Sequence, residues 1–572
     1  MRYLSSGEYL SSSIVFLAEI EFAGRTYRFS SFPLALADGS SEVFYAGKLN
    51  DPDFSLSLDT IGGIKRSTSS ISLSLIFPFS VAKRELSGET LDRAPARIYY
   101  VLSKNGQIQQ SFEDRVLLYR GVISEPVFGH PGVDVGYVEF SIENEIVISD
   151  QSLLRRVVGE NVFLEAAAFS RRGWPGIGSF IPPIDPDGIT DVLDPHQGKV
   201  TPVIIGAPGN ATKPTGETIS YGGSPAYLLA YQNSGNFPAW YIIAGHPVRA
   251  STVKFYDNKG NSEDNVTVHE YISSRGQVYS YVILETGTSI DRTFVVNNDL
   301  EYWLEWDDGG GLISPDTGRD LSGGGDLLIW ALDILKVDFD REAFSAVRSI
   351  LNQYKFSGYI NNEETKIFEF LQQNIVRYLP VSITTGARGL TPIIDNLSDS
   401  LLSPPRIQVE EGPEWERISP VMPENNDIVN DLTIRFAPRN GDDYTSTVKI
   451  SYRRREANNA SYEIVSPFAI LSYQRYGERE QSISLDYVSD RDTAIRIGQN
   501  MLREKSLPQL KTSYRAAFRY GYLELGDVIE ITDADLGVES HRVKIVGKRY
   551  DGASWLYDIL LSSDAIINRR IV

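Results

Sequence analysis

Apolar and polar side chains alternate strictly at both ends of the chain, and this period of two restricts those regions to β-structure. The segment Leu523–Thr532 reads Leu-Glu-Leu-Gly-Asp-Val-Ile-Glu-Ile-Thr, which predicts two short strands. Gly526 and Asp527 between them suit a tight turn, since glycine tolerates positive φ and aspartate offers a short acceptor. Two more alternating segments flank Asp551 and Gly552, a strong hairpin signal. The sequence thus predicts the closing meander of a β-barrel near the C-terminus.

The first 150 residues show the same alternation. Phe54–Leu58 and Ile71–Leu75 each place serine on one face and large apolar residues on the other. Further strand candidates are Ile98–Val101, Val116–Ile123 and Tyr137–Ile142. About seven strands at this spacing fit one barrel or sandwich.

Composition narrows the function classes. The 572 residues predict about three to five domains. Lys+Arg 55 against Asp+Glu 75 gives a net charge of −20, which argues against a non-specific nucleic-acid binder. The absence of cysteine excludes disulfides, zinc–thiolate sites, iron–sulfur clusters and thiol nucleophiles. Ile14–Ile20 is too short for a membrane span and is interrupted by Glu19, so we expect neither a signal peptide nor a membrane-spanning helix. We therefore expect the chain to be synthesised in a bacterial cytoplasm.

The middle of the chain changes character three times. A Pro/Gly-rich crossing segment at 151–205 is followed by a β-rich insertion at 206–320. Residues 326–380, within a block at 321–424, predict three short amphipathic helices. Asp326, Asp340 and a capping box of Asn361 with Glu364 would begin these helices. Residues 425–572 then form the last β-domain, with a helix that starts at Asp490.

The histidines show no metal-binding or catalytic spacing. No two of them lie three or four residues apart, and the zincin and Gly-x-Ser-x-Gly motifs are missing. We therefore interpret them as surface or loop residues. The five histidines are His130, His196, His246, His269 and His541.

Two acidic segments could carry chemistry. Asp185–Asp191 places carboxylates at alternating positions near a glycine, as in a calcium loop, but it lacks the terminal glutamate and contains a proline. Asp307 and Asp308 precede three glycines and could belong to a glycosidase pair. A turn-rich linker and a solvated loop are the simpler interpretations, because adjacent carboxylates are common in so acidic a chain.

Three other patterns have structural explanations. Arg453–Arg455 could bind phosphate, although pairing with acidic residues of a neighbouring domain or subunit is favoured. Gly323–Gly325 precedes a helix but lacks the Lys-Ser/Thr of a phosphate loop. Trp303 and Trp306 could stack on sugar or belong to a core or interface. We therefore predict no catalytic, cofactor-binding or metal residue, no cofactor and no enzymatic activity.

The order of these parts resembles the tail-hub (baseplate-hub) proteins of tailed bacteriophages and of related gene-transfer particles. Three pieces carry the resemblance. Leu117–Ile123 with Tyr137–Ile142 closes the first barrel, Gly198–Gly206 follows the proline-rich crossing, and Leu525–Ile529 opens the terminal meander after the helix at 490–505.

The resemblance implies a mainly β, multi-domain fold with two hub β-barrel domains, at 1–150 and 425–572, a central β-rich segment and a three-helix insert. Such hubs are homotrimers whose six barrels form a pseudo-sixfold ring at the tail tip. The implied partners are the distal tail protein ring or tail tube, a central fibre or spike protein and the C-terminus of the tape-measure protein. DNA would pass through the lumen without specific binding, which suits an acidic chain.

Two other functions stay open from the sequence. One is a secreted or surface β-rich polysaccharide hydrolase that uses two carboxylates, and the other is a glycan-binding adhesin. We expect no secretion signal, which counts against both.

Overall fold

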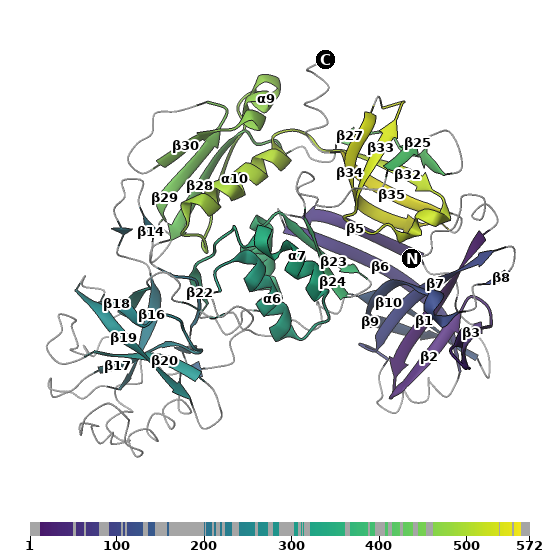
Figure 1. Ribbon diagram of the computed structural model, residues 1–572, viewed down its shortest axis with the longest axis horizontal. Coiled ribbons are helices and arrows are strands. Elements are labelled where there is room, and N and C mark those ends of the chain that lie inside the picture. The colour runs from purple at the N-terminus through teal and green to yellow at the C-terminus, as the bar shows by residue number, and fades with distance from the viewer. Residues whose placement is uncertain are drawn as a thin grey trace.

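The computed structural model describes residues within 12–143, 157–158, 199–313 and 321–561, with gaps inside these ranges. Strands dominate, several sheets are present and helices are few, which confirms the predicted mainly β, multi-domain fold. Among the described helices, none is long and apolar enough to cross a membrane. Figure 1 shows the parts arranged side by side, with the N-terminal strands in purple next to the C-terminal strands in yellow.

The first end region (12–143) consists mainly of long antiparallel strands, with one parallel pair between β2 and β4. β1 pairs with β2 and β7, and the order continues through β9, β10 and β6 to β5. The β9–β10 pair contains the two predicted segments at 117–123 and 137–142. The elements are β1 (Ser12–Phe22), β2 (Arg25–Ser30), β3 (Leu34–Asp38), β4 (Ser41–Gly47), β5 (Asp53–Ile61), β6 (Ile64–Pro78), β7 (Pro95–Lys104), β8 (Gln107–Ile108), η1 (Phe112–Asp114), β9 (Val116–Gly129) and β10 (Val135–Glu143).

The predicted β-rich insertion contains a closed six-stranded barrel, in the order β16-β17-β20-β19-β18-β21. Tyr241 and Phe255 lie in its core, with ring centroids 4.8 Å apart. Short strand pairs precede it. The elements are β11 (Val157–Val158), β12 (Lys199–Val200), β13 (Val203–Ile205), β14 (Ala211–Thr212), β15 (Thr218–Ile219), β16 (Ser224–Ala230), β17 (Ala239–Ala244), β18 (Thr252–Asp257), β19 (Ser262–Ile272), β20 (Val278–Leu284) and β21 (Tyr302–Trp306).

The helical block (324–394) holds the three predicted helices and the hairpin β23–β24. Asp340 caps α7 as predicted, by accepting from the backbone N–H of Ala343. The N-cap residue of α6 is Gly323 and not Asp326, whose carboxylate instead binds Arg348 on α7 and Asn352 at the C-cap of that helix. The predicted capping box at 361–364 lies outside the described residues. The elements are α6 (Gly324–Leu335), α7 (Arg341–Leu351), β22 (Gly358–Ile360), α8 (Ile367–Asn374), η2 (Val376–Tyr378), β23 (Val381–Gly386) and β24 (Gly389–Ile394).

An α/β unit (431–505) follows, in which two helices accompany a four-stranded sheet of order β30-β29-β28-β31. Asp490 caps α10 as predicted. Gly498 lets this helix approach the sheet, because a Cβ there would lie 2.5 Å from the side chains of both Ile434 and Ile450. The elements are β28 (Asp431–Pro438), β29 (Tyr444–Ser451), β30 (Ser461–Val465), α9 (Pro467–Tyr476), β31 (Glu480–Ser484) and α10 (Arg491–Lys505).

The second end region (406–423 and 510–561) contains the predicted closing meander, β33–β34–β35. Leu523–Leu525, however, is not a strand. It follows a short helix and leads into the turn at Gly526, so its alternation reflects the burial of both leucines and not strand pairing. The elements are β25 (Arg406–Val409), β26 (Trp415–Arg417), β27 (Met422–Pro423), β32 (Leu510–Ala516), η4 (Phe518–Tyr522), β33 (Val528–Asp533), β34 (Val538–Tyr550) and β35 (Trp555–Leu561).

Candidate functional site

The two end regions are joined through one strand, β34. Its first part pairs with β33, whereas Gly547–Arg549 pairs antiparallel with Ser55–Ser57 of β5. The strands of both regions therefore belong to one 17-stranded sheet. Figure 1 shows this contact where purple and yellow strands meet. We call this contact the junction.

Aromatic side chains continue the junction into a common core. Phe16 of β1 lies edge-on to Tyr550 of β34, with centroids 5.2 Å apart, and Tyr100 of β7 lies 6.3 Å from Trp555 of β35. Buried residues from both regions form a single cluster. The end regions thus share one hydrophobic core, which fixes their relative orientation.

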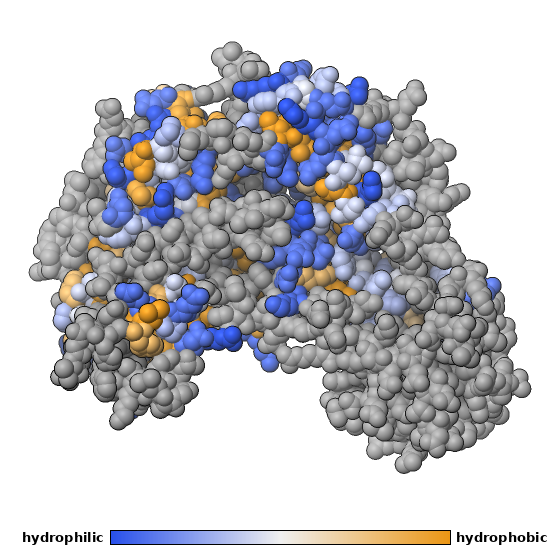
Figure 2. Space-filling view, turned by 180° about the vertical axis from the view of Figure 1, so that it is seen from behind, coloured by the Kyte–Doolittle hydropathy of each residue, from blue (hydrophilic) through white to orange (hydrophobic). Residues whose placement is uncertain are grey.

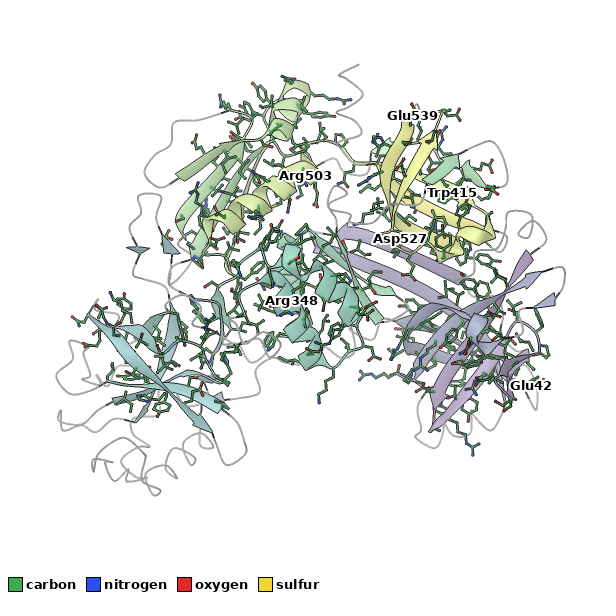
Figure 3. The ribbon with its side chains drawn as sticks, viewed as in Figure 1. Glu42, Arg348, Trp415, Arg503, Asp527 and Glu539 are labelled. Carbon is green, nitrogen blue, oxygen red and sulfur yellow. The ribbon has the colours of Figure 1, made fainter. Side chains whose placement is uncertain are left out.

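A buried lysine lies at the junction. Lys548 is 3% exposed, donates from Nζ to the carbonyl of Gly521 at 2.7 Å, and lies 4.6 Å from the centroid of the Trp555 ring. Burial lowers its pKa to about 8, and the carboxylates of Glu524 and Asp527 oppose this shift. Figure 3 shows Asp527 at the border between the yellow and purple strands.

The Gly526–Asp527 turn also belongs to the junction. Gly526 has φ +83°, and a Cβ there would lie 2.2 Å from the side chain of Ile393 on β24. The Asp527 carboxylate accepts from the backbone N–H of Glu524 at 2.8 Å and closes the turn. The predicted turn roles of both residues are confirmed. Position 526 requires glycine for two reasons, its positive φ and the close approach of Ile393 from the helical block.

Each end region also holds a buried carboxylate bound by a tyrosine and an arginine. In the first, one oxygen of Glu19 accepts from Tyr45 at 2.6 Å, Arg115 at 2.8 Å and Arg28 at 3.1 Å. Burial alone would raise the pKa of this carboxyl, but its hydrogen-bond partners, with Tyr45 foremost, hold it below the ordinary value. Arg115 is in turn close to an aromatic face, 4.4 Å from the centroid of the Tyr99 ring.

The second end region repeats this chemistry with other residues. Asp533, 2% exposed, accepts from Tyr514 at 2.7 Å and pairs with Arg417 at 3.5 Å. Burial, followed by the hydrogen bond to Asp533, raises the pKa of Tyr514. Both carboxylates are fully engaged by neighbours within their own region, which suits a structural role and not proton transfer.

Stability should rise with pH through the titration of Lys548. Its folded-state pKa of about 8 lies below the ordinary value of about 10.4, so the unfolded state binds more protons between these two pH values. We expect the free energy of unfolding to increase by up to about 3 kcal/mol across this range, relative to Lys548→Met. Urea unfolding of both proteins at pH 7.5 and pH 10 measures the difference. An equal change in the two proteins would contradict this assignment.

The described histidines occupy separate places. His246 is buried; its Nε2 accepts from the backbone N–H of Ile204 at 3.0 Å and its Nδ1 lies 2.8 Å from the carbonyl of Pro247. His269 stacks on Tyr281 on the central barrel, and His541 lies on β34. His246 therefore lies in a loop, as one of the two predicted alternatives, but it is buried and not at the surface. The other two histidines, at 130 and 196, lie outside the described residues.

Most of the other candidate residues either lie outside the described residues or have a structural role. The calcium-like segment at 185–191 and the acidic pair at 307–308 lie outside the described residues. Arg453 pairs with Glu478 at 3.5 Å within its own α/β unit and not with a neighbouring domain. Arg454 and Arg455 lie outside the described residues, and pairing with a neighbouring subunit stays a prediction. Trp306 is fully buried and donates to Ser224 at 2.6 Å, which makes it a core residue of the central barrel. Trp303 lies on β21, and its side chain is outside the described part of the structure. Gly323 begins α6, with no phosphate-loop lysine after it.

Three carboxylates approach one another in the α/β unit. Asp431, Glu478 and Glu480 have oxygens within 4.8 Å of one another. Asp431 is 1% exposed and pairs with Lys449 at 3.5 Å, so a cation of the chain already offsets the buried charge. This group gives no reason to revise the prediction that the chain has no metal residue.

Two buried charged groups, Lys548 at the junction and Glu19 in the first end region, differ in how far they can be recognised from the sequence. Lys548 lies in a Gly-Lys-Arg-Tyr segment that reads as an exposed strand end. Glu19 interrupts an apolar run, and this interruption is the one local signal of a buried charged group. Figure 2 shows the molecule from behind the view of Figure 1. The described part of this face is largely hydrophilic, with small separate hydrophobic clusters.

Comparisons with known proteins relate one part of the chain to a family. Residues 398–547 match the model of the family described as putative phage tail protein. No curated protein matches the sequence. The matching part spans the α/β unit and most of the second end region, including β25, β26 and the Gly526–Asp527 turn.

Several solved structures are similar at low sequence identity. The 43 kDa tail protein of prophage MuSo2 from Shewanella oneidensis is 7% identical, with a TM-score of 0.35 over 96% of this chain and 99% of that one. A tail protein from Neisseria meningitidis MC58 is 10% identical, with a TM-score of 0.33 over 96% of this chain and 97% of that one. A chain of a native gene transfer agent virion is 10% identical, with a TM-score of 0.33 over 64% and 86%. The family match over residues 398–547 confirms the predicted resemblance to phage tail proteins.

Proposed function

We propose that the chain is the structural tail-hub protein of a tailed phage or phage-like particle, without enzymatic activity. The observation that carries this proposal is the family match at 398–547, which covers the region where the resemblance to hubs predicted the second barrel. In the proposed assembly, three chains form a ring at the tail tip. The first and second end regions alternate around it and give a pseudo-sixfold surface.

Two features of the chain support this arrangement. The end regions share a sheet and a core through the junction, so each chain would supply two rigidly linked parts to the ring. Each part also contains a buried carboxylate held by a tyrosine and an arginine, at Glu19 and at Asp533. Closed rings protect strand edges from uncontrolled pairing, which favours symmetric assembly for a chain with this many strands.

The proposed partners follow from the position of such a ring. Its pseudo-sixfold face would meet the distal tail protein ring or tail tube, and the opposite side would meet the central fibre or spike. The C-terminus of the tape-measure protein would reach its lumen. The net charge of −20 suits a channel through which DNA passes without being held.

Electron cryo-microscopy of the intact particle tests the proposal. We expect three copies at the tail tip, with the first and second end regions at alternating positions of one ring. Six copies in equivalent positions, or a location on the tail shaft or capsid, would contradict it.

A further inference from the structure

Helix α9 of the α/β unit turns three of its large side chains outward and two of its small ones inward. Ala469 and Ser472, three residues apart, are fully buried. Ile470, Leu471 and Tyr473 on other faces of the helix are 36%, 37% and 41% exposed. A surface helix of a monomer normally does the reverse, because burial of large apolar residues drives its packing.

The exposed apolar residues are concentrated around this helix. Ten large hydrophobic residues are exposed in the described part of the chain, and four of them lie within nine residues, at 465–473. Val465, at the end of β30, is 42% exposed and precedes the helix by two residues. We call these four residues, Val465, Ile470, Leu471 and Tyr473, the α9 patch. Figure 1 shows α9 at the outer end of the α/β unit, away from the helical block.

The helix that carries the patch is firmly held. The buried Asn430 donates to Ser472 Oγ at 3.2 Å and to the carbonyl of Gly477 at 2.7 Å, and accepts from the backbone N–H of Arg479 at 2.8 Å. Tyr473 stacks on Tyr452, with centroids 3.8 Å apart and planes 6° apart. The outward orientation is thus fixed by the fold, which lowers the entropic cost of binding a partner there.

Charge indicates which partner fits. Residues 429–505 contain twelve Lys/Arg and eleven Asp/Glu, a net charge of +1, whereas the whole chain carries −20. The remainder of the chain therefore carries −21. A second copy of this chain is acidic outside this unit, and a nearly neutral unit can meet it without the like-charge repulsion that two acidic parts would have.

We propose that the α9 patch is a contact between copies of this chain, in which α9 of one copy packs against the acidic remainder of the next. A ring of three copies needs a contact of this head-to-tail kind, in which two different surfaces meet. The inference rests on the proposed trimer and adds the surface that holds it together.

Photo-cross-linking identifies what covers the patch. The chain has no cysteine, so Leu471→Cys introduces the one attachment point for a benzophenone-maleimide probe. Trimers are assembled from a mixture of ¹⁵N-labelled and unlabelled full-length chains and irradiated. We expect cross-links that join labelled to unlabelled peptides, with the captured peptides outside residues 429–505. Glu539→Cys on β34, also exposed, is the control and should give few cross-links between chains.

Other captured peptides would overturn the proposal. Cross-links confined to one chain would mean that a segment of the same chain covers the patch. In the intact particle, cross-links to another virion protein alone would assign the patch to that protein. Both outcomes leave the tail-hub function standing, because they change the occupant of α9 and not the position of the chain.

Association measurements separate the two proposals. We expect the double variant Ile470→Ser/Leu471→Ser to weaken trimer association about 100-fold in sedimentation, since central apolar anchors dominate interface energy. Ile334→Ser on α6, which replaces an isoleucine that is 41% exposed, should leave association unchanged. A variant that trimerises like the wild type would overturn the α9 contact alone. A wild-type chain that forms no trimer, even in the particle, would overturn both proposals.

Discussion

We expect Glu19→Ala to lower the free energy of unfolding by about 3–5 kcal/mol, because it removes one partner of a buried ion pair. Three donors converge on one oxygen of Glu19, and the Arg115 side chain that remains is 11% exposed. Without the carboxylate, Arg115 keeps its charge in a site that water reaches poorly. Denaturant unfolding, followed by tryptophan fluorescence and circular dichroism, measures the loss.

A matched control lies two residues away on the same strand. Glu21 pairs with Arg97 at 2.7 Å, but its side chain is 44% exposed. Glu21→Ala should cost less than about 1 kcal/mol, because solvent already screens exposed pairs. Equal losses in the two variants would show that burial of the Glu19 network does not contribute to stability.

Trp415→Ala should lower the free energy of unfolding by about 3–5 kcal/mol. Trp415 is 1% exposed, stacks on Tyr557 with planes 14° apart and lies edge-on to Tyr520. It therefore anchors β26 to strands that follow the α/β unit in the sequence. Figure 3 shows Trp415 inside the second end region.

The neighbouring Ile418 provides the comparison for this change. It is 38% exposed, so Ile418→Ala should cost less than about 1 kcal/mol. Calorimetry and urea unfolding of the two variants should therefore differ clearly. A small loss for Trp415→Ala would mean that the strands at 406–423 are not part of the core of the second end region.

Local patterns in the sequence predicted the elements better than their connections. The strands at 528–561, the cap at Asp490 and the three-helix block were all predicted from neighbours within a few residues, and all are present. Leu523–Leu525 shows the limit of such patterns, because a turn can bury alternate residues as a strand does.

The junction could not be predicted from periodicity. Pairing of Ser57 with Gly547 depends on two segments near opposite ends of the chain, and nothing in either segment specifies the other. Lys548 could not be recognised for a related reason, since a lysine next to an arginine at the end of a strand is typical of a solvent-exposed position. The boundaries predicted for the five domains stay predictions. Strands of the second end region already begin at Arg406, before the boundary predicted at 424.

The junction also constrains when the protein can fold. β5 leaves the ribosome long before its partner β34 does, because several hundred residues separate the two strands. Contacts this distant along the chain form slowly, and until they form one edge of β5 lacks the β34 partner that it has in the final structure. An unpaired strand edge can bind the same edge of another nascent chain. The sheet that unites the two end regions therefore makes the growing chain prone to aggregation until β34 has been synthesised.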